Sequence, residues 1–325
     1  MSEKVCKQGL IKKTDFKIIV IGCYFGELRS DYKLFVRSIE NNPSIDFLIF
    51  SNCKWGELPQ NLKIVSTSFE DIRVNIESNF DFPICLDKPY KLCDYKPAFG
   101  EIFKSYIEGY DFWGHCDFDM IFGDLRAFIT DEKLCNFDKI YIQGHLSLYR
   151  NTERVNLLYK QDGGDLNYRD VFSTNDICVF DEVDGIYHKC NVNGIRVYTK
   201  IEYIDIYPYI NRMWQTRDMY HLNNKVPKNY SKQAFGYCDG HVYKWYKEKG
   251  IIKKKEYAYI HFSHKQFVTD NESDDFYLTS KGLITKNEGE EIPFEIFNWP
   301  VDVVRLIGAE FLFRLKRKIK KWNLI

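Results

Sequence analysis

Two aspartates separated by one residue, Asp117 and Asp119, are the side chains whose type and spacing point most directly to chemistry. They follow the apolar, aromatic stretch from Phe112 to Cys116, so we expect a buried strand to present both carboxylates at its carboxyl end. Carboxylate oxygens suit hard divalent cations such as Mg²⁺ or Mn²⁺, which keep positions open for water and for substrate phosphates. The spacing therefore predicts metal-assisted group transfer from a phosphorylated ligand.

The sequence before these aspartates alternates between strand-like and helix-like patterns. Short apolar runs predict buried strands at residues 16–22, 46–50 and 61–65. Apolar residues at helical spacing predict helices at residues 31–40 and 68–77. Such alternation favours an α/β fold, in which a Rossmann-type, mostly parallel central sheet is flanked by helices. Ligands bind at the carboxyl ends of the strands in such sheets, where we expect the two aspartates to lie.

The segment from Asp94 to Gly100 is expected to lead into a helix over residues 97–108, because Pro97 suits a first helical turn. A loop that precedes a helix presents side chains and backbone donors to anions. Lys96 is therefore a candidate contact for a phosphate, and Asp94 for a sugar hydroxyl. The alternative is that Asp94 caps the helix and Lys96 is solvated.

The pattern becomes less regular after Gly123. We expect a strand at residues 138–142, a pocket-lining turn at 144–150 and a helix at 151–161. Asp124 is expected to position the loop that carries the two aspartates. The paired carboxylates of Asp181 and Glu182 could bind an acceptor or act as a general base, although an exposed turn explains them equally well. Asp239, Gly240 and His241 form a third candidate cluster.

The C-terminal part differs in kind from the rest of the chain. Residues 270–291 are polar and acidic, which predicts an exposed loop or hairpin. An apolar stripe from Val304 to Trp322 and six positive charges between Arg314 and Lys321 predict a basic amphipathic helix. This helix either lies on an anionic membrane as a peripheral contact or packs on the domain with a solvated basic edge.

Composition narrows the classes of function. The 46 basic and 46 acidic residues cancel, so no overall field favours nucleic acid. The 10 cysteines are scattered and include no C-x-x-C pair, which favours a reduced chain over a disulfide framework. The N-terminus has no signal-peptide pattern, and no apolar run reaches the length of a spanning helix. The expected location is the cytoplasm, with the inner face of the membrane as a peripheral site.

Two segments together resemble a known group of enzymes. Asp94 to Gly100 fits the pattern D-Y-K-P-x-[FY]-G, and Trp113 to Leu125 fits W-G-x-x-D-x-D-x-[IV]-F-G-D-L. The joined pattern resembles nucleotide-sugar glycosyltransferases with the GT-A fold and a D-x-D motif, of the bacterial polysaccharide-biosynthesis, DUF6625-like type. The resemblance implies transfer of a hexose-type unit from a nucleoside-diphosphate sugar, UDP-linked by the habit of the family. The implied acceptor is a saccharide or lipid-linked saccharide in surface polysaccharide synthesis.

The same resemblance implies roles for individual residues. Asp119 would be the firmer ligand of Mn²⁺ or Mg²⁺, and Asp117 would bind the metal or the ribose of the donor. His261, which ends an apolar strand, resembles the late histidine of related transferases and would be the third ligand, with His264 in reserve. Lys265 would contact the diphosphate. The alternative is that one of the two histidines is a core residue and the other a surface residue.

The resemblance also divides the chain by function. Residues 1–125 would bind the nucleotide sugar, residues 126–270 of the same GT-A domain would bind the acceptor, and residues 271–325 would form the polar loop and C-terminal helical appendage. The sequence leaves open whether transfer inverts or retains the anomeric configuration. Two other classes stay open. One is a haloacid-dehalogenase-like phosphatase with Asp117 as nucleophile, and the other a non-catalytic glycan- or nucleotide-sugar-binding protein whose aspartates hold Ca²⁺.

Overall fold

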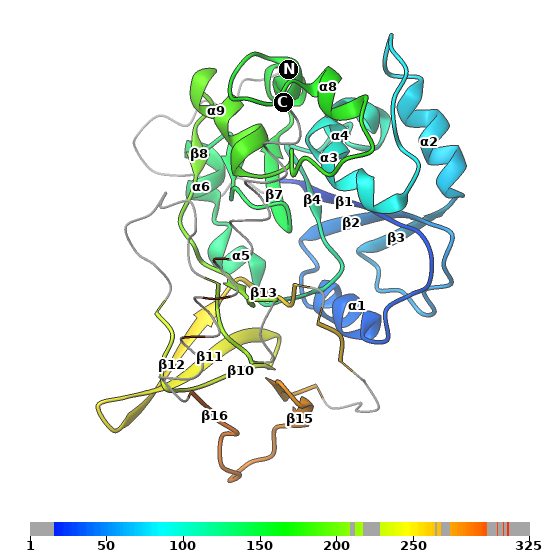
Figure 1. The fold of residues 1–325 in the computed structure, drawn as a ribbon. Helices are drawn as coiled ribbons and strands as arrows, with labels where there is room; N and C mark the ends of the chain where they lie inside the picture. Colours follow the sequence, from blue (N-terminus) through cyan, green and yellow to red (C-terminus); the bar gives the residue numbers. More distant parts are fainter. Residues whose placement is uncertain are drawn as a thin grey trace. The chain divides into compact units, whose positions relative to one another are not determined.

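The structure, a computed structural model, describes residues 16–208, 212–216, 228–263, 265–267 and 274–297, together with Val304, Gly308 and Phe311. The chain divides into two compact units (Figure 1). The first contains the residues up to Phe118 and the segment Leu125–Ile201, and the second contains Asp119–Asp124 and the residues from Glu202 onward. The division between the units therefore falls inside the pair of aspartates, directly after Phe118.

A seven-stranded sheet forms the centre of the first unit, in the order β3-β2-β1-β4-β7-β6-β8. Its strands are β1 Ile18–Tyr24, β2 Ile45–Ser51, β3 Leu62–Ser66, β4 Phe112–Cys116, β6 Lys139–Ile140, β7 Leu146–Arg150 and β8 Val197–Tyr198. The strands β3, β2, β1 and β4 run parallel to their neighbours, whereas β7 is antiparallel to both β4 and β6. The first unit is thus α/β with a mostly parallel sheet, as the sequence predicts.

Helices flank this sheet. The α-helices are α1 Tyr32–Glu40, α2 Phe69–Glu77, α3 Leu92–Tyr95, α4 Phe99–Ile102, α5 Leu125–Phe128, α6 Asp131–Asn136, α7 Glu153–Asn156, α8 Tyr168–Phe172 and α9 His188–Val192. Single 3₁₀ turns occupy Pro89–Lys91, Lys96–Ala98, Lys104–Tyr106 and Leu158–Lys160, and a π-type turn occupies Val183–Tyr187. Helices α2, α3, α4 and α8 gather beside one another in Figure 1.

The elements predicted between residues 16 and 77 are confirmed to within two residues. Helix α1 buries the apolar face that the sequence shows, with Phe35 1% and Ile39 0% exposed. Helix α2 begins with a capping box, in which the Ser68 hydroxyl accepts from the backbone N–H of Asp71 while the Asp71 carboxylate accepts from the backbone N–H of Ser68. Local patterning and capping are sufficient to specify these elements.

Two predictions between residues 97 and 150 are wrong. The helix expected over residues 97–108 is broken into short pieces, because Phe103 leaves the helical region with φ −106° and ψ 30°. Gly100 explains part of this path, since a Cβ there would lie 2.6 Å from the indole of Trp113. The turn expected at residues 144–150 contains strand β7 instead, which pairs with β4 over its whole length.

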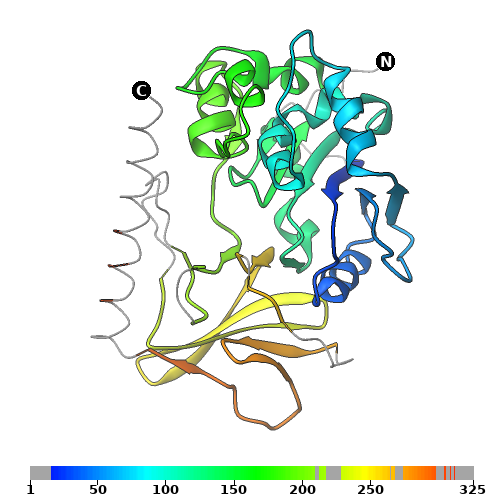
Figure 2. The same ribbon diagram turned by 45° about the vertical axis from the view of Figure 1, so that its right-hand side comes forward.

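Two sheets form the second unit (Figure 2). The larger follows the order β12-β11-β10-β14-β15, and β16 also pairs with β10. Its strands are β10 Lys232–Cys238, β11 His241–Glu248, β12 Ile251–Tyr257, β14 Phe276–Thr279, β15 Gly282–Thr285 and β16 Glu295–Ile296. The smaller sheet follows β5-β13-β9, with β5 Met120–Phe122, β13 Tyr259–His261 and β9 Ile204–Asp205. The hairpin predicted within residues 270–291 is present as β14 and β15, but β14 is buried.

The amphipathic helix predicted near the C-terminus lies outside the described residues, apart from Val304, Gly308 and Phe311. Among the residues that the structure describes, no helix combines the length and the apolar character needed to cross a membrane.

Candidate metal centre

The second unit places Asp119 beside His261. The Nε2 atom of His261 lies 3.3 Å from a carboxylate oxygen of Asp119, and its Nδ1 atom lies 2.8 Å from a carboxylate oxygen of Asp205. All three side chains are largely screened from solvent, with exposed fractions of 13% for Asp119, 14% for His261 and 25% for Asp205. The imidazole therefore bridges two carboxylates in a sheltered position.

The smaller sheet fixes this arrangement. Strand β13 is antiparallel to β5 and parallel to β9, a register that sets His261 opposite Met120 on one side and Asp205 on the other. The backbone N–H of Phe262 donates to the carbonyl oxygen of Asp119 at 2.8 Å. Ser263 follows with a positive φ of 47°, and its hydroxyl donates to the Asp205 carboxylate at 3.0 Å. A strained backbone conformation in a non-glycine residue often marks a functional site.

This geometry fits a divalent cation. Two ligand atoms in adjacent positions of an octahedral Mg²⁺ or Mn²⁺ site, with bonds of about 2.1 Å, lie roughly 3 Å apart. The 3.3 Å between His261 Nε2 and the Asp119 oxygen is close to that separation. Metal-binding histidines usually donate their other ring N–H to a carboxylate, which fixes the tautomer, and Asp205 stands in that position. Imidazole and carboxylate donors together suit Mn²⁺ well.

The raised pKa of His261 also indicates a site that favours positive charge. Burial lowers the pKa of His261, but the carboxylates of Asp119 and Asp205 outweigh it and raise that pKa well above its ordinary value. A proton on the imidazole thus serves as the positive charge between two anions. A divalent cation at Nε2 would replace that proton, so metal binding and protonation compete at this atom.

The first unit gathers a second cluster around Lys96. The Lys96 ammonium donates to Asp117 at 2.6 Å, to Asp181 at 3.1 Å and to the carbonyl oxygen of Gly144 at 2.9 Å. The Asp117 side chain is 36% exposed, whereas that of Asp181 is 5% exposed. Gly144 allows the close approach of Asp181, since a Cβ at residue 144 would lie 2.2 Å from its carboxylate. The alternative of a solvated Lys96 is therefore wrong, because the ammonium is buried between two carboxylates.

One ammonium cannot neutralise both carboxylates fully. Burial lowers the pKa of Lys96, but Asp117 and Asp181 outweigh it and raise that pKa well above its usual range. Burial also raises the pKa of Asp181 to about 6, and Asp117 adds to this rise, although Lys96 opposes it. Burial therefore makes the ionised form of Asp181 less stable than that of an ordinary aspartate.

The raised pKa of Asp181 predicts a pH-dependent stability. The unfolded chain has the ordinary aspartate pKa, so the folded protein binds more protons between about pH 4 and about pH 6, and Asp181 should destabilise it progressively as pH rises through that window. We expect the free energy of unfolding of the wild type to fall relative to that of Asp181→Asn by up to about 3 kcal/mol over this window. Urea unfolding of both proteins at several pH values measures the difference. A difference that stays constant, or that grows in favour of the wild type, would contradict the raised pKa.

Asp94, two residues before Lys96 in the sequence, is fully buried. Its carboxylate accepts from the ammonium of Lys91 at 2.9 Å and from the backbone N–H groups of Cys178 and Phe180 at 2.9 and 2.8 Å. These bonds hold the loop that ends at Asp181. Asp94 therefore has a structural role, and neither caps the helix nor points to a ligand.

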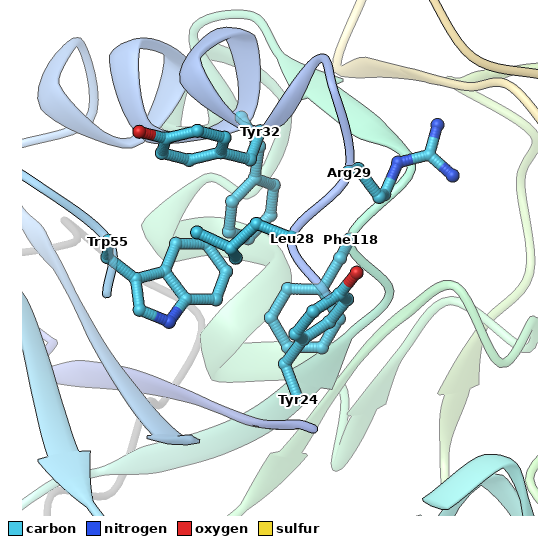
Figure 3. A pocket seen from close by; sticks show the side chains of 7 residues that line it. Tyr24, Leu28, Arg29, Tyr32, Trp55 and Phe118 are labelled. Atoms are coloured by element: carbon cyan, nitrogen blue, oxygen red, sulfur yellow. The ribbon is translucent and has the colours of Figure 1, made fainter. Parts of the chain in front are cut away.

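Phe118, the residue between the two aspartates, is held by an aromatic pocket of the first unit. The pocket is lined by Tyr24, Leu28, Arg29, Tyr32, Phe35, Trp55 and Phe118. Figure 3 shows the Phe118 ring against that of Tyr24, with a centroid separation of 4.9 Å. The side chains around Phe118 leave no room for a water-sized molecule, so this pocket is better explained as the packing site of Phe118 than as a preformed ligand cavity. The pocket anchors the backbone from which Asp117 projects.

The structure also describes most of the remaining predicted residues. Glu182 and Asp124 are half-buried. Burial lowers the pKa of Lys265, and the carboxylate of Glu295 opposes this shift. His264 lies outside the described residues. Asp239 and Gly240 form the tight turn between β10 and β11 with positive φ values of 51° and 80°. His241 pairs with Glu256 across the hairpin at 2.8 Å. A structural turn therefore accounts for this third cluster.

Asp205 is the site residue that sequence reasoning missed. It lies in the two-residue strand β9, and its carboxylate accepts from His261 and Ser263, which are more than fifty residues away along the chain. No motif surrounds it in the sequence. Only the parallel pairing of β9 with β13 brings it to the histidine.

Comparison with known proteins gives a family but no activity. A search of curated proteins finds no match to this chain. The sequence model of one protein family matches residues 20–288, which include both clusters described above and the aromatic pocket. The chain therefore belongs to DUF6625, a family of unknown function.

Proposed function

We propose that the protein is a metal-dependent glycosyltransferase that moves a sugar from a nucleoside-diphosphate sugar to a saccharide or lipid-linked saccharide. The observation that carries this proposal is the chain of contacts from Asp205 through His261 to Asp119. It orients an imidazole nitrogen and a carboxylate oxygen at the separation of adjacent metal ligands. Asp117, one residue before Asp119 in the sequence, is the other carboxylate of the proposed ligand set.

The proposed chemistry is electrostatic. A bound Mn²⁺ or Mg²⁺ would neutralise the diphosphate and stabilise it as the leaving group. Asp205 would keep the Nδ1 proton of His261 in place, so that Nε2 would be the atom that binds the metal. Lys96 holds a buried positive charge next to Asp117, and Lys265 is the proposed contact for the diphosphate. We retain a UDP-linked hexose and surface polysaccharide synthesis as the proposed donor and setting.

The fold proposal is GT-A-like. The parallel order β3-β2-β1-β4 supports it, since such sheets bind ligands at their carboxyl ends and Asp117 directly follows β4. The general-base role of Asp181 is less well supported. Its side chain is only 5% exposed and contacts Lys96, so it could reach an acceptor hydroxyl only after moving.

The proposal is tested with a panel of nucleoside diphosphates and nucleotide sugars, each with and without Mn²⁺. We expect one nucleotide to raise the melting temperature by about 5 °C at saturating concentration, and only with the metal present. The same nucleotide sugar, incubated with glycan acceptors, should release its nucleoside diphosphate.

Each other outcome of this panel counts against the transferase. If no nucleotide shifts the melting temperature, the proposal is wrong. Stable binding of a nucleotide sugar or glycan without any turnover would favour the non-catalytic binding protein. Release of inorganic phosphate from sugar phosphates would favour the phosphatase with Asp117 as nucleophile.

A further inference from the structure

The hairpin of β11 and β12 in the second unit carries an unusual turn region. Strand β12 is an edge strand of the larger sheet, and Figure 1 draws the hairpin in yellow with its turn at the end of the two long strands. The turn is made by Lys249 and Gly250, which have positive φ values of 50° and 82°. Directly after it stand Ile251 and Ile252, which are 64% and 52% exposed.

The two isoleucines cannot be covered by ordinary packing against one surface. Neighbouring residues of a strand point to opposite faces of the sheet, so Ile251 and Ile252 present apolar groups on both faces of the same hairpin end. A protein partner or a helix packed on one face would leave the other isoleucine in water. A medium that surrounds the end of the hairpin would cover both.

Positive charge borders these isoleucines. Five lysines within the hairpin are exposed, against two half-buried acidic residues. These are Glu248, which pairs with Lys253, and Glu256, which pairs with His241. The exposed lysines are Lys247, Lys249, Lys253, Lys254 and Lys255. Because the whole chain has a net charge of zero, this basic region is a local concentration and not a reflection of composition. Charge complementarity therefore favours an anionic partner.

Lysines alone would have a simpler explanation. Edge strands often carry lysine, which discourages pairing with another chain. Two adjacent exposed isoleucines have the opposite effect, because their apolar surface favours association at the end of the hairpin. An apolar end bordered by long basic side chains is instead the arrangement that suits an anionic bilayer, in which alkyl groups enter the acyl boundary and lysines reach back to the headgroups.

The dimensions agree with this arrangement. A strand rises about 3.3 Å per residue, so Lys255 lies roughly 10 Å along the strand from Ile252. Interfacial segments bury their apolar groups about 5–10 Å below the headgroups. The ammonium of Lys254, which lies 3.4 Å from the centre of the Tyr243 ring, would then stand near the level of the lipid phosphates.

We propose that the β11–β12 hairpin is a membrane-docking element, which inserts Ile251 and Ile252 into the surface of an anionic lipid bilayer while its five exposed lysines bind the headgroups. This element is independent of the metal centre and of the proposed transferase activity. It is also distinct from the C-terminal basic segment, which lies outside the described residues.

The test is co-sedimentation of the full-length protein with vesicles of phosphatidylcholine, with and without phosphatidylglycerol. We expect binding only to the anionic vesicles, and weaker binding at high salt because salt screens the lysines. The double variant Ile251→Ser/Ile252→Ser should lose at least about tenfold in vesicle affinity. The variant Val192→Ser, which alters a 66% exposed apolar residue of α9, is the matched control and should bind like the wild type.

A direct readout separates the hairpin from other basic segments. The variant Ile252→Trp should show a blue-shifted difference fluorescence when anionic vesicles are added, because its indole enters the acyl boundary. Equal vesicle binding by the wild type and the double variant would overturn the proposal, as would an unshifted indole in Ile252→Trp. Binding of dextran sulfate by the wild type, without binding to anionic vesicles, would assign the lysines to an acidic polymer and overturn it as well.

Discussion

Replacing Asp94 by alanine is expected to lower the free energy of unfolding by about 3–5 kcal/mol, the usual cost of removing one partner from a buried ion pair. The Lys91 side chain is 2% exposed, and the substitution would leave its ammonium without a counter-ion in the interior. The backbone N–H groups of Cys178 and Phe180 would lose their acceptor at the same time. Urea unfolding of the variant at neutral pH measures the loss.

Two further variants make this result specific. Asp94→Asn keeps an acceptor oxygen of similar shape and should lose less stability than the alanine variant. Asp81→Ala removes an exposed partner of Arg169 and should cost less than about 1 kcal/mol. A fully stable Asp94→Ala protein with weakened nucleotide binding would instead support the donor contact that the sequence suggested for this residue.

Replacing Asp119 by alanine is expected to lower the affinity for Mn²⁺ by at least about 100-fold. The variant loses a direct carboxylate ligand, and even substitutions of groups that only orient a ligand cost about 10–100-fold. Calorimetric titration of the metal into wild type and variant measures the change. Nucleotide-dependent stabilisation that requires Mn²⁺ should disappear with it.

Two other carboxylates provide the controls for this second prediction. Asp205→Ala should weaken Mn²⁺ binding by about 10–100-fold, because it removes the acceptor that orients His261. Asp81→Asn alters an acidic residue whose side chain is 77% exposed and should leave the affinity near that of the wild type. Unchanged Mn²⁺ affinity in Asp119→Ala would remove this residue from the metal centre.

The sequence is sufficient to predict the elements whose determinants are local. Strands β1 and β2 are short apolar runs, and helix α2 has its capping residues three positions apart, so the pattern and the structure agree closely. Asp119 could also be predicted as a candidate metal ligand. The spacing of two carboxylates after an aromatic strand is a local signal that needs no knowledge of distant partners.

Contacts between distant segments could not be predicted in the same way. Asp205 and His261 are brought together by strand pairing, and Lys96 meets Asp181 across 85 residues of sequence. Asp94 illustrates the difficulty most clearly. As a carboxylate in a loop-like segment it suggests a cap or a ligand contact, yet its partners are a buried lysine and two backbone groups more than eighty residues later.

The misjudged helix after Pro97 has a related cause. Apolar residues recur there at helical spacing, but the large ring of Trp113 lies directly against Gly100 and must be accommodated. Packing of these bulky groups outweighs local helix propensity and divides the segment into short turns. Helical periodicity therefore identified the buried side chains of this segment without identifying its backbone path.

Pulsed electron paramagnetic resonance of Mn²⁺ bound to the protein detects nitrogen atoms bonded to the metal, and therefore tests whether His261 is a ligand. We expect nitrogen modulation from one directly coordinated imidazole in the wild type, and its loss in His261→Gln. The same signal should persist in His241→Gln, which alters a histidine of the larger sheet that pairs with Glu256. Stoichiometric Mn²⁺ without nitrogen coupling, or coupling that survives in His261→Gln, would contradict the assignment of His261 and Asp119 as a metal centre.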